Sequence, residues 1–491
     1  MRRLWTLVYM LLVVTLLYGG FRAYAYDDVF ITYRYASNLA SGAGLVYNPG
    51  ERVLSTTSPL WAALLSPFAA LGLDVHAAAV LLGAFSLAAG GICLWQIGRA
   101  SRQPWIAWAG LLLYPLHPVV TGTLGSETPL YLALGLGALA LHLRGRPRLA
   151  AACAGLAAAA RPDGLLFAAV IGLDALAQSW NARRRGGRSP LPWGAAGIFL
   201  LAWLPWVLWA WAYYGSPLPV TLAAKQAQGT LAVSQSFWGG FWQTLHTSAE
   251  AGYFRLELGL ALVGMVFLVW RLVRGWREGA LRAGLADLRP LGLLLGWTLA
   301  YFAAYTALGV TRYFWYYAPL LPALVVGIGL GLDALGQAAA RIFPPRSRLL
   351  RLALPALVCA GLVLAQGEAL AHTAPDVRMS VYRQAGEWLQ ANTPPEASVG
   401  TLEVGLLGYI SQRRMVDFAG LLQPETAAQL SVQGSYDRTA QWAVQRYQPE
   451  VLVLQEGLFG ELESWLRSTN CAVVKRFPGL KWELIVYTCV W

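Results

Sequence analysis

The sequence has little charge and few of the residues that build soluble catalytic or metal sites. Only 13% of its 491 residues are Asp, Glu, Lys or Arg, whereas soluble domains carry about 25%. Its five Cys and five His show no zinc-site spacing. It also has no Walker motif or glycine-rich phosphate loop. These absences exclude a disordered chain, a coiled coil and an ordinary cytosolic enzyme, and they give no sign of nucleotide binding.

Apolar residues are abundant instead, at 57% of the chain. Long apolar runs separated by short polar segments are typical of a polytopic α-helical membrane protein. We predict eleven membrane helices, at 4–21, 76–98, 105–119, 128–143, 149–161, 164–180, 193–213, 252–271, 291–308, 315–338 and 350–367. The first is expected to be an uncleaved helix rather than a signal peptide. The shorter run 60–73 is predicted to lie at the membrane interface.

Arginines predict the orientation of these helices, because they cluster in alternate loops. The clusters are Arg2/Arg3, Arg99/Arg102, Arg144/Arg146/Arg148, Arg183/Arg184/Arg185/Arg188, Arg271/Arg274/Arg277/Arg282 and Arg341/Arg346/Arg348. The positive-inside rule makes these loops and the N-terminus cytoplasmic. Segments 22–75, 120–127, 214–251, 309–314 and everything after 367 then face outward. The rule accounts for the net charge of +12, so we expect no nucleic-acid partner.

The chain after residue 367 has a different composition, with 13 acidic and 10 basic residues in 368–491. A helix is predicted over 377–391, short strands at 398–401, 415–417 and 451–454, and a hairpin over 471–488. We therefore predict a transmembrane domain over 1–367, with large outer loops 22–75 and 214–251, and an extracytoplasmic α/β domain over 368–491. A hairpin centred on Leu480 puts Cys471 opposite Cys489. An oxidising compartment would permit a disulfide there, and the alternative is two buried thiols.

Two adjacent carboxylates, Asp27 and Asp28, follow the first membrane helix at its outer end. Two like charges at a membrane boundary are costly unless a cation, a metal or a proton offsets them. The pair suits a general base that deprotonates an alcohol, or a metal site. The alternative is a pair at the start of a helix over 29–40, where Asp is favoured.

The outer loop that begins with this pair resembles those of the membrane glycosyltransferases of the GT-C fold, which use polyprenyl-phosphate sugars. The loop continues through Tyr47-Asn48-Pro49-Gly50-Glu51-Arg52 to Thr57-Ser58-Pro59-Leu60-Trp61. It is most similar to bacterial members of the arabinofuranosyltransferase and protein O-mannosyltransferase-like group. Shorter matching segments are Gly125-Ser126-Glu127-Thr128-Pro129-Leu130, Arg161-Pro162-Asp163-Gly164 and Gly400-Thr401-Leu402-Glu403.

The resemblance implies an inverting transfer of one sugar from a polyprenyl-phosphate donor. The acceptor would be an envelope glycan, lipid or protein at the outer face of the bacterial cytoplasmic membrane, and the sugar arabinofuranose, mannose or another hexose. Among relatives the first acid of the pair is usually the base, which implies Asp27. Asp28 would then orient the acceptor or help hold a metal. Metal use varies across the fold, so the resemblance leaves a Ca, Mg or Mn ion on Asp27 and Asp28 undecided.

Other residues of the outer segments are candidates because a leaving phosphate needs cations. Lys225, Arg312 and Arg161 are predicted to bind the donor phosphate. Their alternatives are a solvated loop residue, an interfacial anchor and a partner of Asp163, respectively. Arg34, Glu127 and His246 are predicted to bind substrate. Their alternatives are a salt bridge, a carboxylate at a helix N-terminus and a residue with no functional role.

Two other functions are compatible with a polytopic chain. A sugar or lipid transporter or flippase needs charged or broken helices at the midplane and often has internal repeats, whereas the acids here gather at the outer edge. A non-catalytic scaffold that binds envelope polymer would not need Asp27 or Asp28. We expect the tail to cover the site or help bind the acceptor. Glu403 and Asp417 either face the site or belong to the core of the tail.

Overall fold

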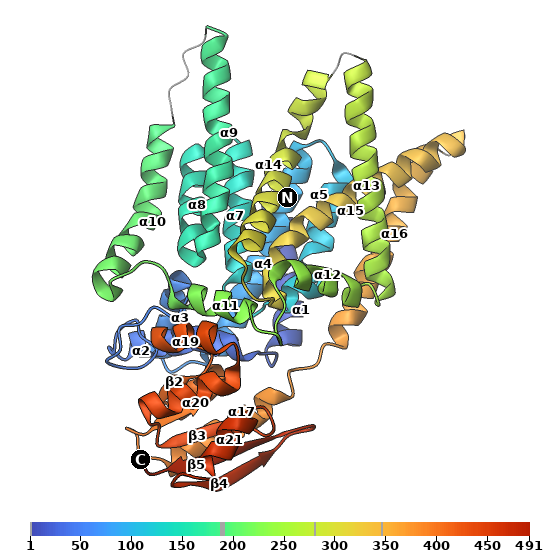
Figure 1. Ribbon diagram of the computed structural model, residues 1–491. Helices are drawn as coiled ribbons and strands as arrows, with labels where there is room; N and C mark the ends of the chain where they lie inside the picture. Colours follow the sequence, from blue (N-terminus) through green and yellow to red (C-terminus); the bar gives the residue numbers. More distant parts are fainter. Residues whose placement is uncertain (1, 187–191, 279–280, 345–346) are drawn as a thin grey trace.

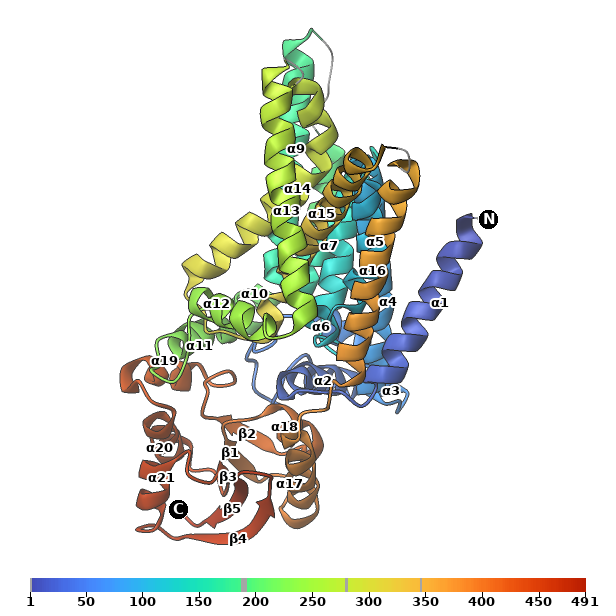
Figure 2. The ribbon, with the colours of Figure 1, turned by 90° about the vertical axis from the view of Figure 1, so that its right-hand side faces the viewer.

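The computed structural model describes residues 2–186, 192–278, 281–344 and 347–491. It consists of a bundle of long helices with a small sheet domain at one end, formed by the C-terminal part of the chain (Figures 1 and 2). Short helices of the first outer loop lie between the two parts (Figure 2). The first outer loop and the C-terminal domain therefore meet at one end of the bundle.

The bundle is built from the predicted apolar runs. Its long helices are α1 (Arg2–Phe21), α4 (Val75–Ala100), α9 (Leu165–Arg184), α10 (Trp193–Tyr214), α13 (Gly252–Arg277), α14 (Leu281–Leu308), α15 (Leu321–Ile342) and α16 (Ser347–Ala371). Shorter members are α5 (Pro104–Leu112), α6 (Pro118–Thr121), α7 (Thr128–Leu143) and α8 (Pro147–Ala160), with 3-10 turns at Tyr114–Leu116, Pro162–Gly164, Phe314–Tyr316 and Ala318–Leu320.

Within the described chain, eight helices are long and apolar enough to cross a membrane. A further three predicted spans, at 105–119, 128–143 and 149–161, coincide with shorter apolar helices, Pro104–Leu116, Thr128–Leu143 and Pro147–Ala160. The predicted count of eleven is therefore not confirmed by helix length. The eight long helices indicate a multi-pass membrane protein.

Local chemistry explains two features of the bundle. Helix α4 begins at Val75 because the Asp74 side chain accepts hydrogen bonds from the main-chain N–H groups of His76 and Ala77, at 2.9 and 3.1 Å. Helices α13 and α15 pack closely because small residues meet at their crossing. A Cβ atom added to Gly264 would lie 2.2 Å from the carbonyl oxygen of Gly327, so a larger residue would force the helices apart.

Basic residues gather at the end of the bundle away from the sheet domain. The last turns of α9, α13 and α15 carry Arg183/Arg184, Arg274/Arg277 and Arg341, and Figure 1 shows these helix ends opposite the sheet domain. This matches the predicted alternation of arginine-rich and outer loops. Arg188 and Arg346 lie outside the described residues.

The sheet domain has five strands in the order β2-β1-β3-β5-β4. They are β1 (Ser398–Thr401), β2 (Arg414–Asp417), β3 (Val451–Gln455), β4 (Cys471–Pro478) and β5 (Glu483–Cys489). Strands β2, β1 and β3 are parallel, and β5 and β4 add antiparallel. The helices of this domain are α17 (Arg378–Asn392), α18 (Gly405–Ser411), α19 (Pro424–Gln433), α20 (Tyr436–Tyr447) and α21 (Gly460–Leu466). Cys471 lies opposite Cys489 across the hairpin, as predicted, and the two form a disulfide, which the sequence had left open against two buried thiols.

The outer loops contain short helices rather than extended chain. They are α2 (Asp27–Ala40) and α3 (Pro59–Ala70) in the first loop, and α11 (Val220–Gly229) and α12 (Phe237–Ser248) in the second. Asn48 holds the first loop to the sheet domain, because its amide donates to the Met415 carbonyl (2.9 Å) and accepts from the Met415 N–H (3.0 Å). The sheet domain is thus fastened to the loop that carries the acid pair.

Candidate active site

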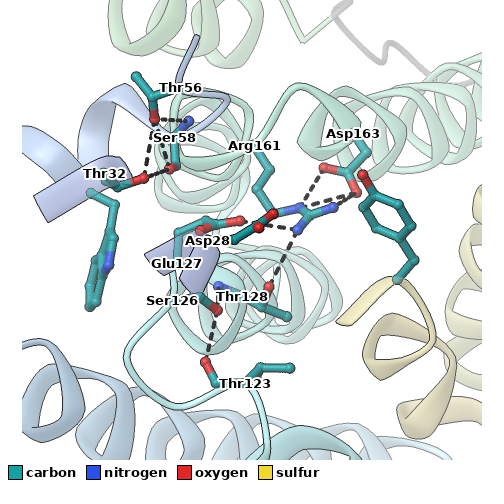
Figure 3. A network of polar contacts seen from close by, with 12 residues as sticks. Asp28, Thr32, Thr56, Ser58, Thr123, Ser126, Glu127, Thr128, Arg161 and Asp163 are labelled. Carbon is teal, nitrogen blue, oxygen red and sulfur yellow. Dashed lines mark hydrogen bonds and ion pairs between the residues drawn. The ribbon is translucent and has the colours of Figure 1, made fainter. Parts of the chain in front are cut away.

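A cavity of about 410 Å³ lies where the two outer loops meet the end of the bundle. Its wall includes Asp28 and Thr32 of α2, Glu127 before α7, Arg161 after α8 and Lys225 of α11. Four of the residues predicted from the sequence therefore line a single cavity. Figure 3 shows Asp28, Glu127, Arg161 and several hydroxyl groups around this space.

Helix α2 presents one of the two acids to the cavity and the other to the sheet domain. Asp28 and Thr32 are four residues apart, so they share the face that lines the cavity. Asp27 and Arg34, two turns apart, share the face that contacts α18. A pair that is adjacent in sequence is therefore split between two environments.

The Asp27 carboxylate is held at the N-terminus of α18. It accepts hydrogen bonds from the main-chain N–H groups of Gly405 and Leu406, each at 2.8 Å. Its side chain is buried and is not part of the cavity wall. Burial raises the pKa of Asp27 to about 6, with a contribution from the Asp28 charge, although the two N–H donors oppose this rise. Both acids lie in the first turn of α2, as the alternative of an acid pair at a helix start expects, and Asp27 in addition binds the N-terminus of α18.

Arg34 completes the attachment of α18 to α2. Its guanidinium donates to the carbonyl oxygens of Gly408 and Arg413, at 2.8 and 2.6 Å, and lies 4.3 Å from the centre of the Tyr47 ring. Asp27 therefore binds the N-terminal end of α18 and Arg34 its C-terminal end, which is the arrangement of charges that the helix dipole favours. Arg34 does not line the cavity, so the structure places this predicted substrate-binding residue at the domain junction.

Asp28 and Lys225 meet in the cavity wall. The Lys225 ammonium lies 3.1 Å from Asp28 Oδ2 and 3.8 Å from the centre of the Tyr313 ring. Burial disfavours the charge on Lys225, but Asp28 together with Tyr313 and Tyr316 outweighs burial, so the lysine pKa is raised. Lys225 is 8% exposed, which rules out the alternative of a solvated loop residue.

Contacts on both sides of α11 hold Lys225 in this position. The N–H of Val220 donates to the Leu54 carbonyl (2.9 Å), and the N–H of Thr311 donates to the carbonyl of Lys225 itself (3.0 Å). The Gln228 amide donates to the Ala419 carbonyl of the sheet domain (3.3 Å). The lysine is therefore supported by the first loop, the segment that follows α14 and the sheet domain together.

Arg161 organises a second polar wall. Its guanidinium contacts Glu127 Oε1 at 3.1 Å, Asp163 at 3.1–3.3 Å, Thr128 Oγ1 at 3.3 Å and the Tyr305 hydroxyl at 2.7 Å. Figure 3 shows Arg161 between Glu127 and Asp163. Because two carboxylates already surround this cation, Arg161 is less free than Lys225 to neutralise a phosphate.

Besides Asp27 and Arg34, two further predicted residues lie away from the cavity wall. Arg312 is exposed and donates to the side-chain oxygens of Gln235 (3.3 Å) and Gln243. His246 is exposed on α12. Neither residue lines the cavity that contains Asp28 and Lys225.

A cluster of hydroxyl groups in the wall was not among the residues predicted from the sequence. The side-chain oxygens of Thr32, Thr56 and Ser58 lie 3.2–3.3 Å from one another, as Figure 3 shows. Trp61, Tyr305 and other aromatic residues complete the wall. Thr57–Trp61 was part of the resembling segment, so the signal was present, but the sequence alone does not tell which hydroxyls share a face.

The other side of the cavity is apolar. It is formed by leucines of α9, α11 and α14 and by the chain before α11, among them Leu165, Leu218, Leu222 and Leu308. Leu218 is 65% exposed, and Leu165 and Leu308 are 38% and 39% exposed. Since α9 and α14 are candidate membrane spans, this side faces the region where lipid would lie.

The acid pair does not form a metal cage. No group of three or more His, Cys, Asp or Glu side chains within the described ranges is arranged to hold a metal ion. Asp27 is bound by two N–H groups and Asp28 by an ammonium. These partners do not fit a divalent ion held by the pair.

The chain has the GT-C fold. The structure of ArnT from Cupriavidus metallidurans bound to undecaprenyl phosphate matches it with a TM-score of 0.64 at 15% identity, over 99% of this chain and 98% of that chain. The archaeal oligosaccharyltransferase AglB from Archaeoglobus fulgidus, in complex with an inhibitory peptide and a dolichol-phosphate, matches with a TM-score of 0.60 at 12% identity, over 92% of this chain and 69% of that chain. At these identities the likeness establishes the fold.

Two sequence comparisons cover smaller parts of the chain. A terminal beta-(1->2)-arabinofuranosyltransferase of Mycobacterium tuberculosis is 33% identical over an alignment of 232 residues, and the match covers 42% of this chain. The matched region is 36% of that relative's length. Residues 372–488 match a family model described as a domain of unknown function, DUF8728, and this range contains the whole sheet of the C-terminal domain except the end of β5.

Proposed function

We propose that the chain is an inverting glycosyltransferase that moves one sugar from a polyprenyl-phosphate donor to a cell-envelope acceptor at the outer face of the bacterial cytoplasmic membrane. The observation that carries the proposal is the pairing of Asp28 and Lys225 in one cavity wall, 3.1 Å apart, opposite an apolar side. A carboxylate can take the acceptor proton, an ammonium can neutralise a phosphate, and an apolar opening can admit a lipid tail. The GT-C fold and the named ligands of its two structural neighbours support the same chemistry.

Asp28 is the base in this proposal. Its carboxylate accepts the proton of the acceptor hydroxyl while that oxygen attacks the anomeric carbon of the donor. The bond between the anomeric carbon and the phosphate oxygen breaks, and the electron pair leaves with the polyprenyl phosphate. Attack opposite the leaving group inverts the anomeric configuration.

Lys225 couples donor binding to the activation of this base. In the structure its ammonium is held by Asp28. A donor phosphate placed against Lys225 would share that ammonium and weaken its hold on the carboxylate. The carboxylate would then become more basic at the moment when the donor is in place, and the ammonium would stabilise the charge of the leaving phosphate.

Asp27 has a positioning role in this proposal, which departs from the assignment that the resemblance implies. Both of its oxygens accept N–H groups of α18, and its side chain is absent from the cavity wall. By fixing α18 against α2, it sets the direction of the neighbouring Asp28. The hydroxyl groups of Thr32, Thr56 and Ser58 line the same cavity and are placed to bind sugar hydroxyls.

A transfer assay with the purified full chain tests the proposal. A panel of radiolabelled polyprenyl-phosphate sugars and of nucleotide sugars would be offered with a crude envelope acceptor. We expect transfer from a polyprenyl-phosphate sugar only, with a product whose anomeric configuration is opposite to that of the donor. Retention of configuration, or transfer from a nucleotide sugar, would contradict the proposal.

Asp437→Asn provides a matched control for Asp27→Asn and Asp28→Asn in this assay. Asp437 accepts the N–H groups of Glu461 and Leu462 at 2.8 and 2.9 Å, as Asp27 does for α18, but it does not line the cavity. We expect this variant to keep wild-type transfer. If folded wild-type protein transferred no sugar while it moved labelled lipid across a vesicle membrane, the flippase alternative would replace the proposal.

A further inference from the structure

A second cavity, of about 420 Å³, lies at the arginine-rich end of the bundle, far from the sheet domain. Its wall brings together Arg271 and Arg274 of α13, Arg341 of α15, Arg351 of α16 and Arg102 of the loop between α4 and α5. These residues come from four separate parts of the sequence, and they lie at or next to the ends of candidate membrane spans.

The acids around this cavity do not balance its arginines. Glu278 pairs with Arg274 at 2.7 Å. Arg102 lies 3.3 Å from Asp287, which is outside the cavity wall. Arg341 and Arg351 have no carboxylate within ion-pair distance in the part of the chain that the structure describes, so the cavity has an excess of positive charge.

The floor of the cavity fixes one further arginine through a buried network. With its amide nitrogen turned toward the carboxylate, Gln103 donates to Asp333 Oδ2 at 3.1 Å and accepts from Arg271. The Gln337 amide donates to the same carboxylate oxygen at 3.0 Å. Both Gln103 and Asp333 are buried. The floor is therefore a built polar structure rather than a chance meeting of surface arginines.

An aromatic side chain supports the arginines on one side. The guanidinium groups of Arg274 and Arg341 lie 5.6 and 5.7 Å from the centre of the Trp270 ring. A guanidinium that stacks on a ring keeps its N–H edges free to bind an anion. Arg102 adopts a left-handed backbone conformation, with φ of 55°, that non-glycine residues rarely use. The residue in this left-handed turn, Arg102, is itself part of the cavity wall.

The positive-inside rule explains arginines near helix ends, but it does not require them to converge on one cavity. We propose that this cavity binds a phosphate group, as carried by the headgroup of an anionic membrane lipid. Its position at the ends of membrane spans and its exposed Trp270 suit a headgroup with its acyl chains beside the bundle. The proposal stands independently of glycosyl transfer.

Native mass spectrometry of the full chain in detergent tests this site. Phosphatidylglycerol would be titrated against wild type, Arg341→Gln/Arg351→Gln and the control Arg144→Gln/Arg146→Gln. The control also removes two arginines from this end of the bundle, but outside the cavity. We expect the apparent Kd for phosphatidylglycerol to rise about tenfold or more in the first variant and to stay at the wild-type value in the control.

Two further arms identify the ligand and check folding. Inorganic phosphate that fails to displace the lipid would show that the lipid is the source of the phosphate, and displacement at similar concentrations would assign the site to free phosphate. Arg341→Lys/Arg351→Lys keeps the charge, so it should bind within a few-fold of wild type. Equal loss in both glutamine double variants, or loss in neither, would overturn the proposal.

Discussion

Replacing Arg34 with Met should loosen the sheet domain without changing the cavity. The substitution keeps an unbranched apolar side chain but removes the hydrogen bonds to the carbonyls of Gly408 and Arg413. Hydrogen bonds from a charged donor contribute about 1.5–3 kcal/mol each, and the relief of burying a charge offsets part of that loss. We therefore expect the attachment of α18 to weaken by about 2–4 kcal/mol.

Hydrogen exchange measured by mass spectrometry reports this loosening directly. A loss of about 3 kcal/mol raises the open population by roughly a hundredfold, so the amides of Gly405–Ser411 and Arg414–Asp417 should exchange faster by about that factor. Arg52→Met is the control, because Arg52 is exposed in the same loop and lies over the Tyr213 ring instead. Unchanged exchange in Arg34→Met together with a raised KM for the donor would refute this reasoning and assign Arg34 to substrate binding.

Three further predictions follow from the site and the sheet domain. Lys225→Met should lower kcat/KM by about a hundredfold, because it removes the cation for the leaving phosphate. Arg312→Met should change kcat/KM little, and a similar loss in both variants would contradict the assigned site. Burial and the neighbouring Asp27 raise the pKa of Glu403 to about 8. The folded chain therefore binds the Glu403 proton more tightly than the unfolded chain does. Thermal stability should fall as the pH rises from about 5 to about 8, because the protonated side chain stabilises the fold. Burial also raises the pKa of Asp27 to about 6 and that of Asp417 to about 7, so Glu403→Gln should reduce the slope without abolishing it. An unchanged slope would count against the assignment. Cys489→Ser should lower the free energy of unfolding by about 3 kcal/mol, because it opens the loop of 18 residues that the disulfide closes. Thermal unfolding with and without reductant measures this loss. Equal sensitivity of the wild type and of Cys489→Ser to reductant would contradict the prediction.

Hydrophobic periodicity and turn-forming residues were enough to predict most of the elements of the fold. The three buried strands and the hairpin of the tail were predicted within a residue or two of β1, β2, β3, β4 and β5, because short apolar runs bounded by turns have few alternatives. The number of membrane spans was harder to predict. A run such as 149–161 is apolar but shorter than a bilayer, and only packing decides how deeply such a helix inserts.

The site was predictable as a set of candidates but not as an arrangement. The unusual outer position of Lys225 and the acid pair identified two true members of the cavity wall. Neighbours in sequence gave no sign that Asp27 and Asp28 would separate, because the partner of Asp27 lies 378 residues away, at Gly405. The docking of α18 on α2, a long-range contact, makes that distinction.

The most direct test of the account compares Asp28→Asn with Asp27→Asn in the transfer assay. If Asp28 is the base, Asp28→Asn should lower kcat by about a thousandfold and leave hydrogen exchange in α18 unchanged. Asp27→Asn should speed exchange in α18 and lower kcat far less than Asp28→Asn does, because it loosens the support of the base but leaves the base itself in place. A thousandfold loss in Asp27→Asn with wild-type exchange, and near-normal transfer by Asp28→Asn, would contradict the account and make Asp27 the base.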